Sequence, residues 1–261
     1  MKGGGASFFL DRRGAGLGAH LLRAIAAVVP LACAPHAADA TPRASACGAC
    51  RVAASPLWIE KTQAPQAARN TPGVFDFYVL SLSWSPGFCE SPGAAHANGE
   101  CDPGANLGFV VHGLWPQYDR GFPSDCRPAA RSPSRIALES ARDLFPSEEL
   151  ARHEWAKHGT CSGKSPTDYF ADVRRARDSV TIPTPFVGPK EKQTWAPLDI
   201  LRAFVAANSR LRPGMLGLEC KKAILQEIRI CFSKDLRDFR ACPEVSRQGC
   251  RTREISIPPV H

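Results

Sequence analysis

Cysteines constrain what this chain can fold into more than any other residue type. The 261 residues include 11 cysteines, and eight of these lie between positions 89 and 250. Such a number is typical of a protein that folds in an oxidising compartment and is held together by disulfide bonds. As a hypothesis we pair Cys89 with Cys101, Cys126 with Cys161, Cys220 with Cys250, and Cys231 with Cys242.

Residues 1–40 have the pattern of an export signal. Basic residues precede an apolar stretch over 25–34, and Ala38 and Ala40 form a small-residue cleavage pattern before Thr41. We therefore expect a signal peptide over 1–40 and a periplasmic or secreted protein. Two alternatives fit the residues less well, a twin-arginine signal at Arg12 and Arg13 and a lipoprotein signal at Cys33.

Residues 41–72 are expected to be a disordered tail or linker. They are rich in Ala, Pro and Thr and show no sustained apolar period. Cys47 and Cys50 form CGAC here, and the flanking residues lack the βαβ pattern of a redox CxxC motif, so we expect a local disulfide. The folded domain is predicted over 73–261.

The folded region alternates β-rich and amphipathic segments without a regular βαβ repeat, which predicts an α+β fold. We expect a mainly antiparallel central sheet that is flanked by helices and stabilised by disulfides. Strands are predicted over 74–84, 107–115, 216–222 and 223–232, and helices over 134–145, 147–158, 166–180 and 197–208.

Two histidine segments carry the chemistry. In FVVHGLWPQ, β-formers lead to His112, which we place at a strand end because Gly113 and Pro116 break the pattern. The other segment reads HEWAKHGTC from residue 153 to residue 161. If it is helical, its polar residues share a face about 140° wide. These are His153, Glu154, Lys157 and His158.

Two other chemistries fit this pattern poorly. HEWAKH resembles the zinc signature HExxH, but its histidines are five residues apart, so they would point about 140° away from each other around a helix. No GxSxG elbow for a nucleophilic serine occurs in the sequence. We therefore expect no metal and no cofactor.

Two histidines that differ in protonation suit the cleavage of RNA without a metal. The ribose 2′-hydroxyl is a nucleophile that must be deprotonated, and the leaving 5′-oxygen must be protonated. Lys157 would stabilise the charge on the phosphoryl oxygens. The net charge of +8 suits a polyanion, although such a charge is equally ordinary for solubility.

FVVHGLWPQY and HEWAKHGTC resemble the two active-site segments of the ribonuclease T2 family, and FDFYVLSLSWSPGFC resembles the family's first strand. The resemblance implies an α+β endoribonuclease with little base specificity that forms a 2′,3′-cyclic phosphate and then hydrolyses it to a 3′-phosphate. It makes His112 and His158 the acid/base pair, which histidine is the base being left open. It implies that Glu154 and Lys157 stabilise the transition state and that His153 binds the phosphate. It places the bases against Trp115, Gln117 and Tyr118, with core packing an equal alternative for Trp115.

RNA is the only partner that these residues imply, and we expect a monomer. Two other hypotheses stay open: an RNA-binding relative without turnover, which would be expected to lack a catalytic histidine, and a metal-dependent hydrolase, which chelation would inactivate.

Overall fold

The computed structural model describes residues 70–91, 99–126 and 132–260. The predicted signal peptide, the linker up to residue 69 and the CGAC cysteines lie outside these ranges. In chain order the elements are β1 (Phe77–Trp84), α2 (Ser85–Cys89), β2 (Phe109–Gln117), α3 (Arg135–Glu139), α4 (Glu148–Lys157), a 3-10 turn (Gly159–Ser162), α5 (Pro166–Asp178), a second 3-10 turn (Thr184–Phe186), β3 (Gln193–Trp195), α6 (Pro197–Ala207), β4 (Leu216–Lys221), β5 (Ile224–Ser233), α7 (Pro243–Arg247) and β6 (Ile255–Ile257).

The strands form one sheet in the order β2-β1-β5-β6-β3, and β4 also pairs with β5. Every pairing is antiparallel except the short contact between β5 and β6. All eight residues of β1 are buried, as expected for a strand with covered faces and neighbours on both sides. The predicted α+β fold with a mainly antiparallel sheet is therefore confirmed.

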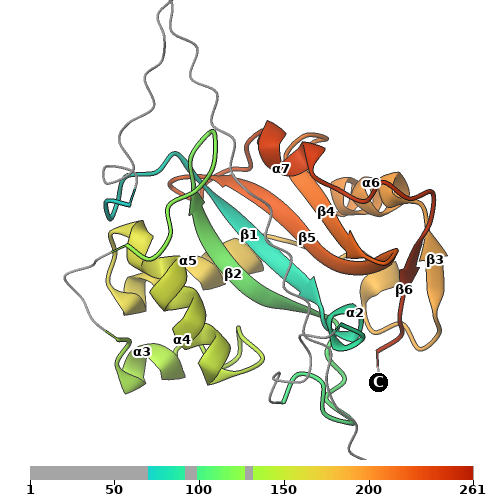
Figure 1. Cartoon of the computed structure of the whole chain (residues 1–261), viewed down its shortest axis with the longest axis horizontal. Helices are drawn as coiled ribbons and strands as arrows, with labels where there is room; N and C mark the ends of the chain where they lie inside the picture. Colours follow the sequence, from blue (N-terminus) through green and yellow to red (C-terminus); the bar gives the residue numbers. More distant parts are fainter. Residues whose placement is uncertain (1–69, 92–98, 127–131, 261) are drawn as a thin grey trace, which may run out of the picture. The chain divides into compact units, whose positions relative to one another are not determined.

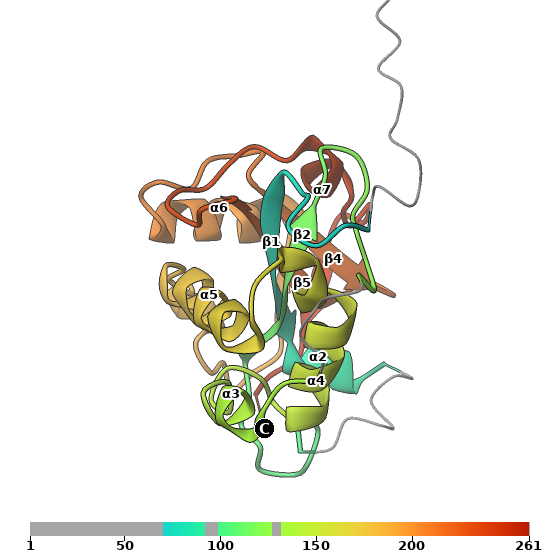
Figure 2. The same ribbon diagram turned by 90° about the vertical axis from the view of Figure 1, so that its left-hand side faces the viewer.

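Helices α3, α4 and α5 gather beside β2, whereas α6 and α7 lie near β4 (Figures 1 and 2). Local sequence explains where the longer helices begin. Ser147 and Ser165 cap α4 and α5 by accepting hydrogen bonds from the N–H groups of Leu150 and Asp168. No helix in the described part of the chain is long and apolar enough to cross a membrane.

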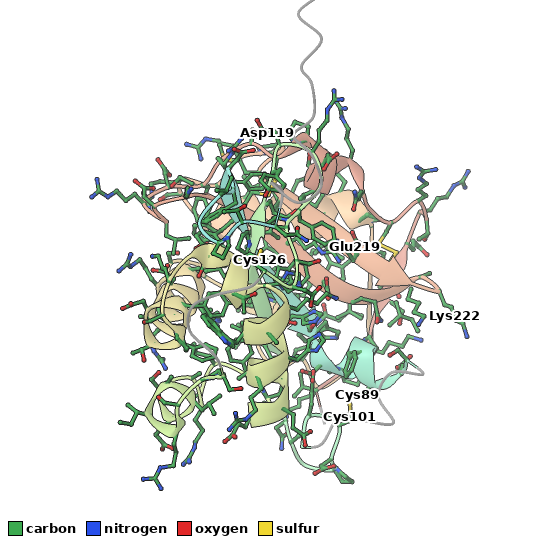
Figure 3. The ribbon with its side chains drawn as sticks, turned by 60° about the vertical axis from the view of Figure 1, so that its left-hand side comes forward. Cys89, Cys101, Asp119, Cys126, Glu219 and Lys222 are labelled. Atoms are coloured by element: carbon green, nitrogen blue, oxygen red, sulfur yellow. A yellow bond between two sulfur atoms is a disulfide. The ribbon has the colours of Figure 1, made fainter. Side chains whose placement is uncertain are left out.

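The described residues contain four disulfides, and these join the four predicted pairs of cysteines (Figure 3). Cys89–Cys101 closes the segment after α2, and Cys126–Cys161 joins the loop after β2 to the turn after α4. The other two bonds attach the C-terminal segment to β4 and β5. The disulfides therefore fasten the segments after α2 and β2 as well as the C-terminal segment.

The structure differs from the predicted elements in several places. The helix expected over 134–145 ends at Glu139, because the Ser140 hydroxyl donates to the carbonyl oxygen of Ala137 and the chain continues in turns. The loop expected from Pro86 onward begins with the short helix α2. Strands β3 and β6 were not predicted, since three residues are too few to show a period.

Candidate active site

Strand β2 does not end at His112, which corrects the sequence prediction. It continues to Gln117, and its register against β1 shifts between Ser81, which pairs with Gly113, and Leu82, which pairs with Val111. His112 is thus the extra residue of a β-bulge. A bulge reverses the alternation of faces, so residues 112, 113, 115 and 117 can all point to one side of the sheet.

Helix α4 supplies the opposite wall of the site. It ends at Lys157, and the N–H of His158 donates to the carbonyl oxygen of Glu154 at 2.9 Å. His158 is therefore the C-terminal cap of the helix and is held in place by the last turn. The four polar residues that the sequence placed on one helix face all reach the same cavity as His112.

The cavity measures about 520 Å³ and is bordered by β2, α4, β5, α7 and the loop after β2. A larger cavity of about 890 Å³ lies against α3 and the start of α4, and no histidine lines it. The residues that line the two-histidine cavity are Val79, His112, Trp115, Gln117, Gly121, Phe122, His153, Glu154, Lys157, His158, Glu227, Arg229, Glu244, Val245 and Gln248.

Glu154 and Trp115 lie together in this cavity. The indole N–H of Trp115 donates to Oε2 of Glu154 at 2.7 Å, and Oε1 of Glu154 lies 3.6 Å from Nε2 of His112. The Trp115 ring centroid is 5.3 Å from that of His112 and 5.2 Å from that of His158. One indole therefore contacts both imidazoles and holds the carboxylate next to the first.

Gly113 makes this close packing possible. A Cβ atom at this position would lie 2.0 Å from Oε2 of Glu154 and 2.4 Å from Nε1 of Trp115. No side chain fits there without displacing the carboxylate. The glycine that follows His112 is thus required by the approach of α4 to β2.

His112 lies between two carboxylates. Its Nδ1 is 2.6 Å from Oε1 of Glu227, and its Nε2 faces Glu154. Burial lowers the pKa of His112, but the hydrogen bond to Glu227 and the charges of both carboxylates outweigh burial, so the pKa is raised above its usual value. The surroundings of His112 therefore favour the imidazolium.

His158 has the opposite surroundings. It is buried, and its Nδ1 has no hydrogen-bond partner among the described residues. Burial, together with the charge of Lys157 and the neighbouring imidazoles of His112 and His153, lowers the pKa of His158 to about 3. The free protein thus pairs a neutral imidazole with one that holds a proton.

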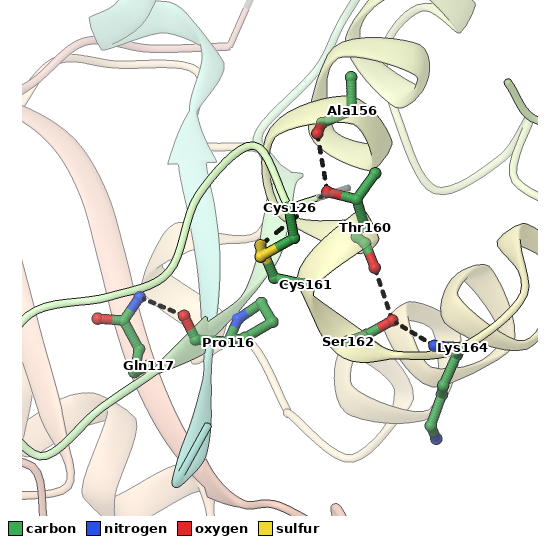
Figure 4. The surroundings of a disulfide bond; sticks show 9 residues. Pro116, Gln117, Cys126, Ala156, Thr160, Cys161, Ser162 and Lys164 are labelled. Carbon is green, nitrogen blue, oxygen red and sulfur yellow. Dashed lines mark hydrogen bonds between the residues drawn. A yellow bond between two sulfur atoms is a disulfide. The ribbon is translucent and has the colours of Figure 1, made fainter. Parts of the chain in front are cut away.

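Tyr118 differs from the other two residues that were predicted to bind the bases. Trp115 and Gln117 line the cavity, whereas Tyr118 does not and packs against the main core. The side-chain amide of Gln117 donates to the carbonyl oxygen of Pro116 at 3.1 Å, which fixes its orientation (Figure 4).

Among the cavity residues that sequence reasoning missed are Glu227, Arg229 and Phe122. Glu227 and Arg229 stand two apart on β5, and this alternation of charges within an apolar strand was a signal for a polar face turned toward the site. Phe122 comes from the loop after β2. Its side chain is 56% exposed and its ring centroid lies 6.4 Å from that of His158.

The loop that carries Phe122 is fixed at both ends. The N–H of Gly121 donates to Glu244 at 2.8 Å, and the N–H of Asp125 donates to the carbonyl oxygen of Lys157 at 2.8 Å. Cys126, the residue after Asp125, forms a disulfide with Cys161 that fastens the loop to the turn after α4 (Figure 4). The loop is therefore held against the helix that carries His158.

Two imidazoles with contrasting surroundings in one cavity of an α+β fold are the arrangement of an acid–base enzyme. Comparison with known proteins identifies its kind. Residues 75–242 match the model of the ribonuclease T2 family. The chain belongs to this family, and it is an endoribonuclease.

Relatives and solved structures agree. The chain is similar to a ribonuclease of Aeromonas hydrophila, with 36% identity over 182 residues that cover 68% of this chain and 80% of the relative. It is 27% identical to ribonuclease DdI of Dictyostelium discoideum, over 69% of this chain and 84% of that protein. An RNase-related protein from Calystegia sepium shares the fold, with a TM-score of 0.58, 23% identity and coverage of 72% of this chain and 98% of that chain.

Proposed function

We propose that this protein cleaves single-stranded RNA with low base specificity, by transphosphorylation to a 2′,3′-cyclic phosphate followed by hydrolysis to a 3′-phosphate, without a metal ion. The observation that carries the proposal is the pair of imidazoles with contrasting surroundings in one cavity. His112 lies 2.6 Å from a carboxylate, whereas His158 is buried against Trp115 and near the positive charge of Lys157.

In the first step His158 accepts the proton of the ribose 2′-hydroxyl. The 2′-oxygen then forms a bond to phosphorus, the bond from phosphorus to the 5′-oxygen breaks, and His112 donates its proton to that leaving oxygen. The pKa of about 3 describes His158 in the free protein. A phosphodiester that binds beside the imidazoles brings negative charge, which raises both pKa values and makes His158 a stronger base.

In the second step the two histidines exchange roles. His112, now neutral, accepts a proton from water, the water oxygen bonds to phosphorus, and the bond to the 2′-oxygen breaks as His158 returns its proton. The product is a 3′-phosphate, and both histidines regain their starting states.

The other polar groups assist the two histidines by binding the phosphate, stabilising its charge or orienting His112. Lys157 stabilises the negative charge that builds on the phosphoryl oxygens, Glu154 orients His112 through the 3.6 Å contact, and His153 binds the phosphate. Trp115, Gln117 and Phe122 provide a surface for bases. Stacking on an aromatic face is tolerant of base identity, which accounts for low specificity. Tyr118 supports this surface from the core side.

We also propose that the protein is exported to the periplasm or secreted, with a signal peptide over 1–40, a linker over 41–72 and a catalytic domain over 73–261. Four disulfides support export, since such bonds persist in oxidising compartments. We expect the catalytic domain to act as a monomer.

A digestion of matched oligonucleotides tests the proposal. A short RNA and its all-DNA analogue are incubated with the oxidised protein in excess EDTA between pH 4 and pH 8, and product ends are identified by mass spectrometry. We expect cleavage of RNA alone, with cyclic-phosphate ends that convert to 3′-phosphates. The double variant H112A/H158A, purified in the same way, controls for contaminating nucleases. Intact RNA, or products with 5′-phosphates, would overturn the proposal.

A further inference from the structure

Glu227 makes the shortest polar contact of His112. Its Oε1 lies 2.6 Å from Nδ1 of the imidazole, and the Glu227 side chain is 12% exposed. Burial would raise the pKa of Glu227, but the hydrogen bond and charge of His112, together with Arg229, lower it to about 2. A carboxylate accepts and cannot donate, so the proton of this hydrogen bond resides on Nδ1.

His112 on β2 and Glu227 on β5 meet across β1, the strand that lies between them. Ser83 of β1 pairs with Val110 on β2 and with Glu227 on β5, and Ser81 pairs with Gly113 and Arg229. Both serines are small and buried, so the long side chains of the two outer strands can meet above β1. The bulge at residue 112 then turns the imidazole toward β5.

Arg229 holds Glu227 in turn. Its guanidinium donates to Oε2 of Glu227 at 3.0 Å through Nε and to Oε1 of Glu219 at 3.1 Å through Nη1. It also lies over the Trp115 ring, at 5.3 Å from the ring centroid. The carboxylate of Glu227 is thus fixed on one oxygen by arginine and on the other by histidine. Glu219, on β4, is the last carboxylate in this chain of contacts.

We infer that Glu227 is a positioning residue of the active site, which fixes the His112 imidazole with Nδ1 protonated and Nε2 directed at the scissile phosphate, and which keeps the imidazole charged for its role as the acid. The inference rests on the proposed function. Orienting a catalytic imidazole through its second nitrogen controls both its tautomer and its basicity.

Other charges also face His112. Glu154 approaches from α4, Arg229 lies beside Glu227 on β5, and the buried Glu100 interacts from the segment before β2. His158 adds a further imidazole. Of these groups, Glu227 alone contacts Nδ1 in the described structure. Removing Glu227 should therefore change the pKa of His112 more than removing any of the other groups.

The variant E227Q tests this role, because glutamine keeps the size of the side chain and removes its charge. We expect kcat on a dinucleotide substrate to fall on the order of tenfold to a hundredfold at neutral pH, with KM changed by less than about threefold. The alkaline limb of the kcat profile should move to lower pH by about one unit or more. The variant E227D, which retains the charge, should recover most of that displacement.

The matched control is E219Q. It removes a carboxylate from the same arginine without touching His112, so it should keep the wild-type pH profile. A purely structural role for Glu227 predicts a lower melting temperature for E227Q with the alkaline limb in place, and this result would overturn the inference.

An NMR titration of the imidazole nitrogens separates the inference from the proposed function. In the wild type we expect His112 to titrate above its usual pKa with Nδ1 protonated in the neutral form, and in E227Q to titrate lower. An unchanged pKa for His112 in E227Q overturns the inference whether or not the protein cleaves RNA. A wild-type protein that leaves RNA intact overturns the proposed function, whatever the titration gives.

Discussion

The indole N–H of Trp115 donates a 2.7 Å hydrogen bond to Glu154, a carboxylate whose side chain is 1% exposed. A buried carboxylate without such a partner is costly, and burial already raises the pKa of Glu154 above its usual value. The chemistry of the cavity thus depends on the Trp115 ring, which contacts both imidazoles while its N–H group satisfies the buried carboxylate of Glu154.

Replacing Trp115 by Phe should therefore damage both stability and turnover. The variant W115F keeps the aromatic ring but leaves Oε2 of Glu154 without its donor, which we expect to cost about 1–3 kcal/mol in the free energy of unfolding and to lower kcat. Urea unfolding and initial rates measure the two effects. W195F is the control, since Trp195 donates to Gln193 at 2.7 Å in β3, away from the histidines. Equal losses in the two variants would contradict the role given to Trp115.

Gly113→Ala should also disturb the carboxylate of Glu154, by crowding it. The added methyl would lie 2.0 Å from Oε2 of Glu154, so the carboxylate or helix α4 must move. We expect a loss of about 1–3 kcal/mol in the free energy of unfolding and a clear fall in kcat. Gly108→Ala is the matched control, because its Cβ would approach the Trp84 ring no closer than 3.4 Å. A G113A protein as active as G108A would show that the packing around Glu154 is not required.

The sequence predicted which residues form this site better than it predicted how they are arranged. The helical spacing placed four polar residues of α4 on one face, and the structure brings all of them to His112. Register could not be predicted, because the bulge at His112 is a property of the pairing between β1 and β2 and leaves no local period. Glu227 was missed for the same reason: it meets His112 only because β5 and β2 flank β1, a relationship between segments 115 residues apart.

His112→Ala and His158→Ala should each abolish most turnover. Loss of one general acid or base lowers a rate by about 10²–10⁴-fold, and we expect kcat for each variant to fall in this range. Circular dichroism should show an intact fold, since alanine keeps the backbone N–H that caps α4 at position 158 and the backbone pairing of β2 with β1. If either variant retained a near wild-type rate, that histidine would have no part in the chemistry.

Removing the Cys126–Cys161 bond should affect catalysis as well as stability. The bond spans 35 residues, and loop-closure entropy gives about 4 kcal/mol for C126A/C161A. Because the bond holds the loop of Phe122 against the end of α4, we also expect a higher KM for RNA. The control C89A/C101A opens a bond of separation 12, which corresponds to roughly 3 kcal/mol, and should leave KM unchanged. Identical KM values in the two double variants would contradict the anchoring role.

The buried imidazole of His158 should make the protein less stable in acid. Its pKa is lowered from 6.5 to about 3, so as pH falls below 6.5 the unfolded chain takes up a proton that the folded protein refuses. This residue therefore subtracts stability between pH 6.5 and about 3, at a slope of up to about 1.4 kcal/mol per pH unit. His112 does not mask the effect. Its folded pKa is raised, so its stabilising contribution is complete below pH 6.5 and is lost only as pH rises through the folded value.

The comparison that isolates His158 is the unfolding free energy of the wild type and of H158Q, each measured by urea unfolding at pH 6 and at pH 4. Carboxylates that titrate in this range are common to both proteins and cancel in the difference. We expect the wild type to lose about 2–3 kcal/mol more than H158Q over the two pH units. Equal losses would mean that His158 accepts a proton in the folded protein near its usual pKa. His158 would then be charged together with His112 in mild acid. The proposed roles of His158 as a neutral base and His112 as a protonated acid would be contradicted.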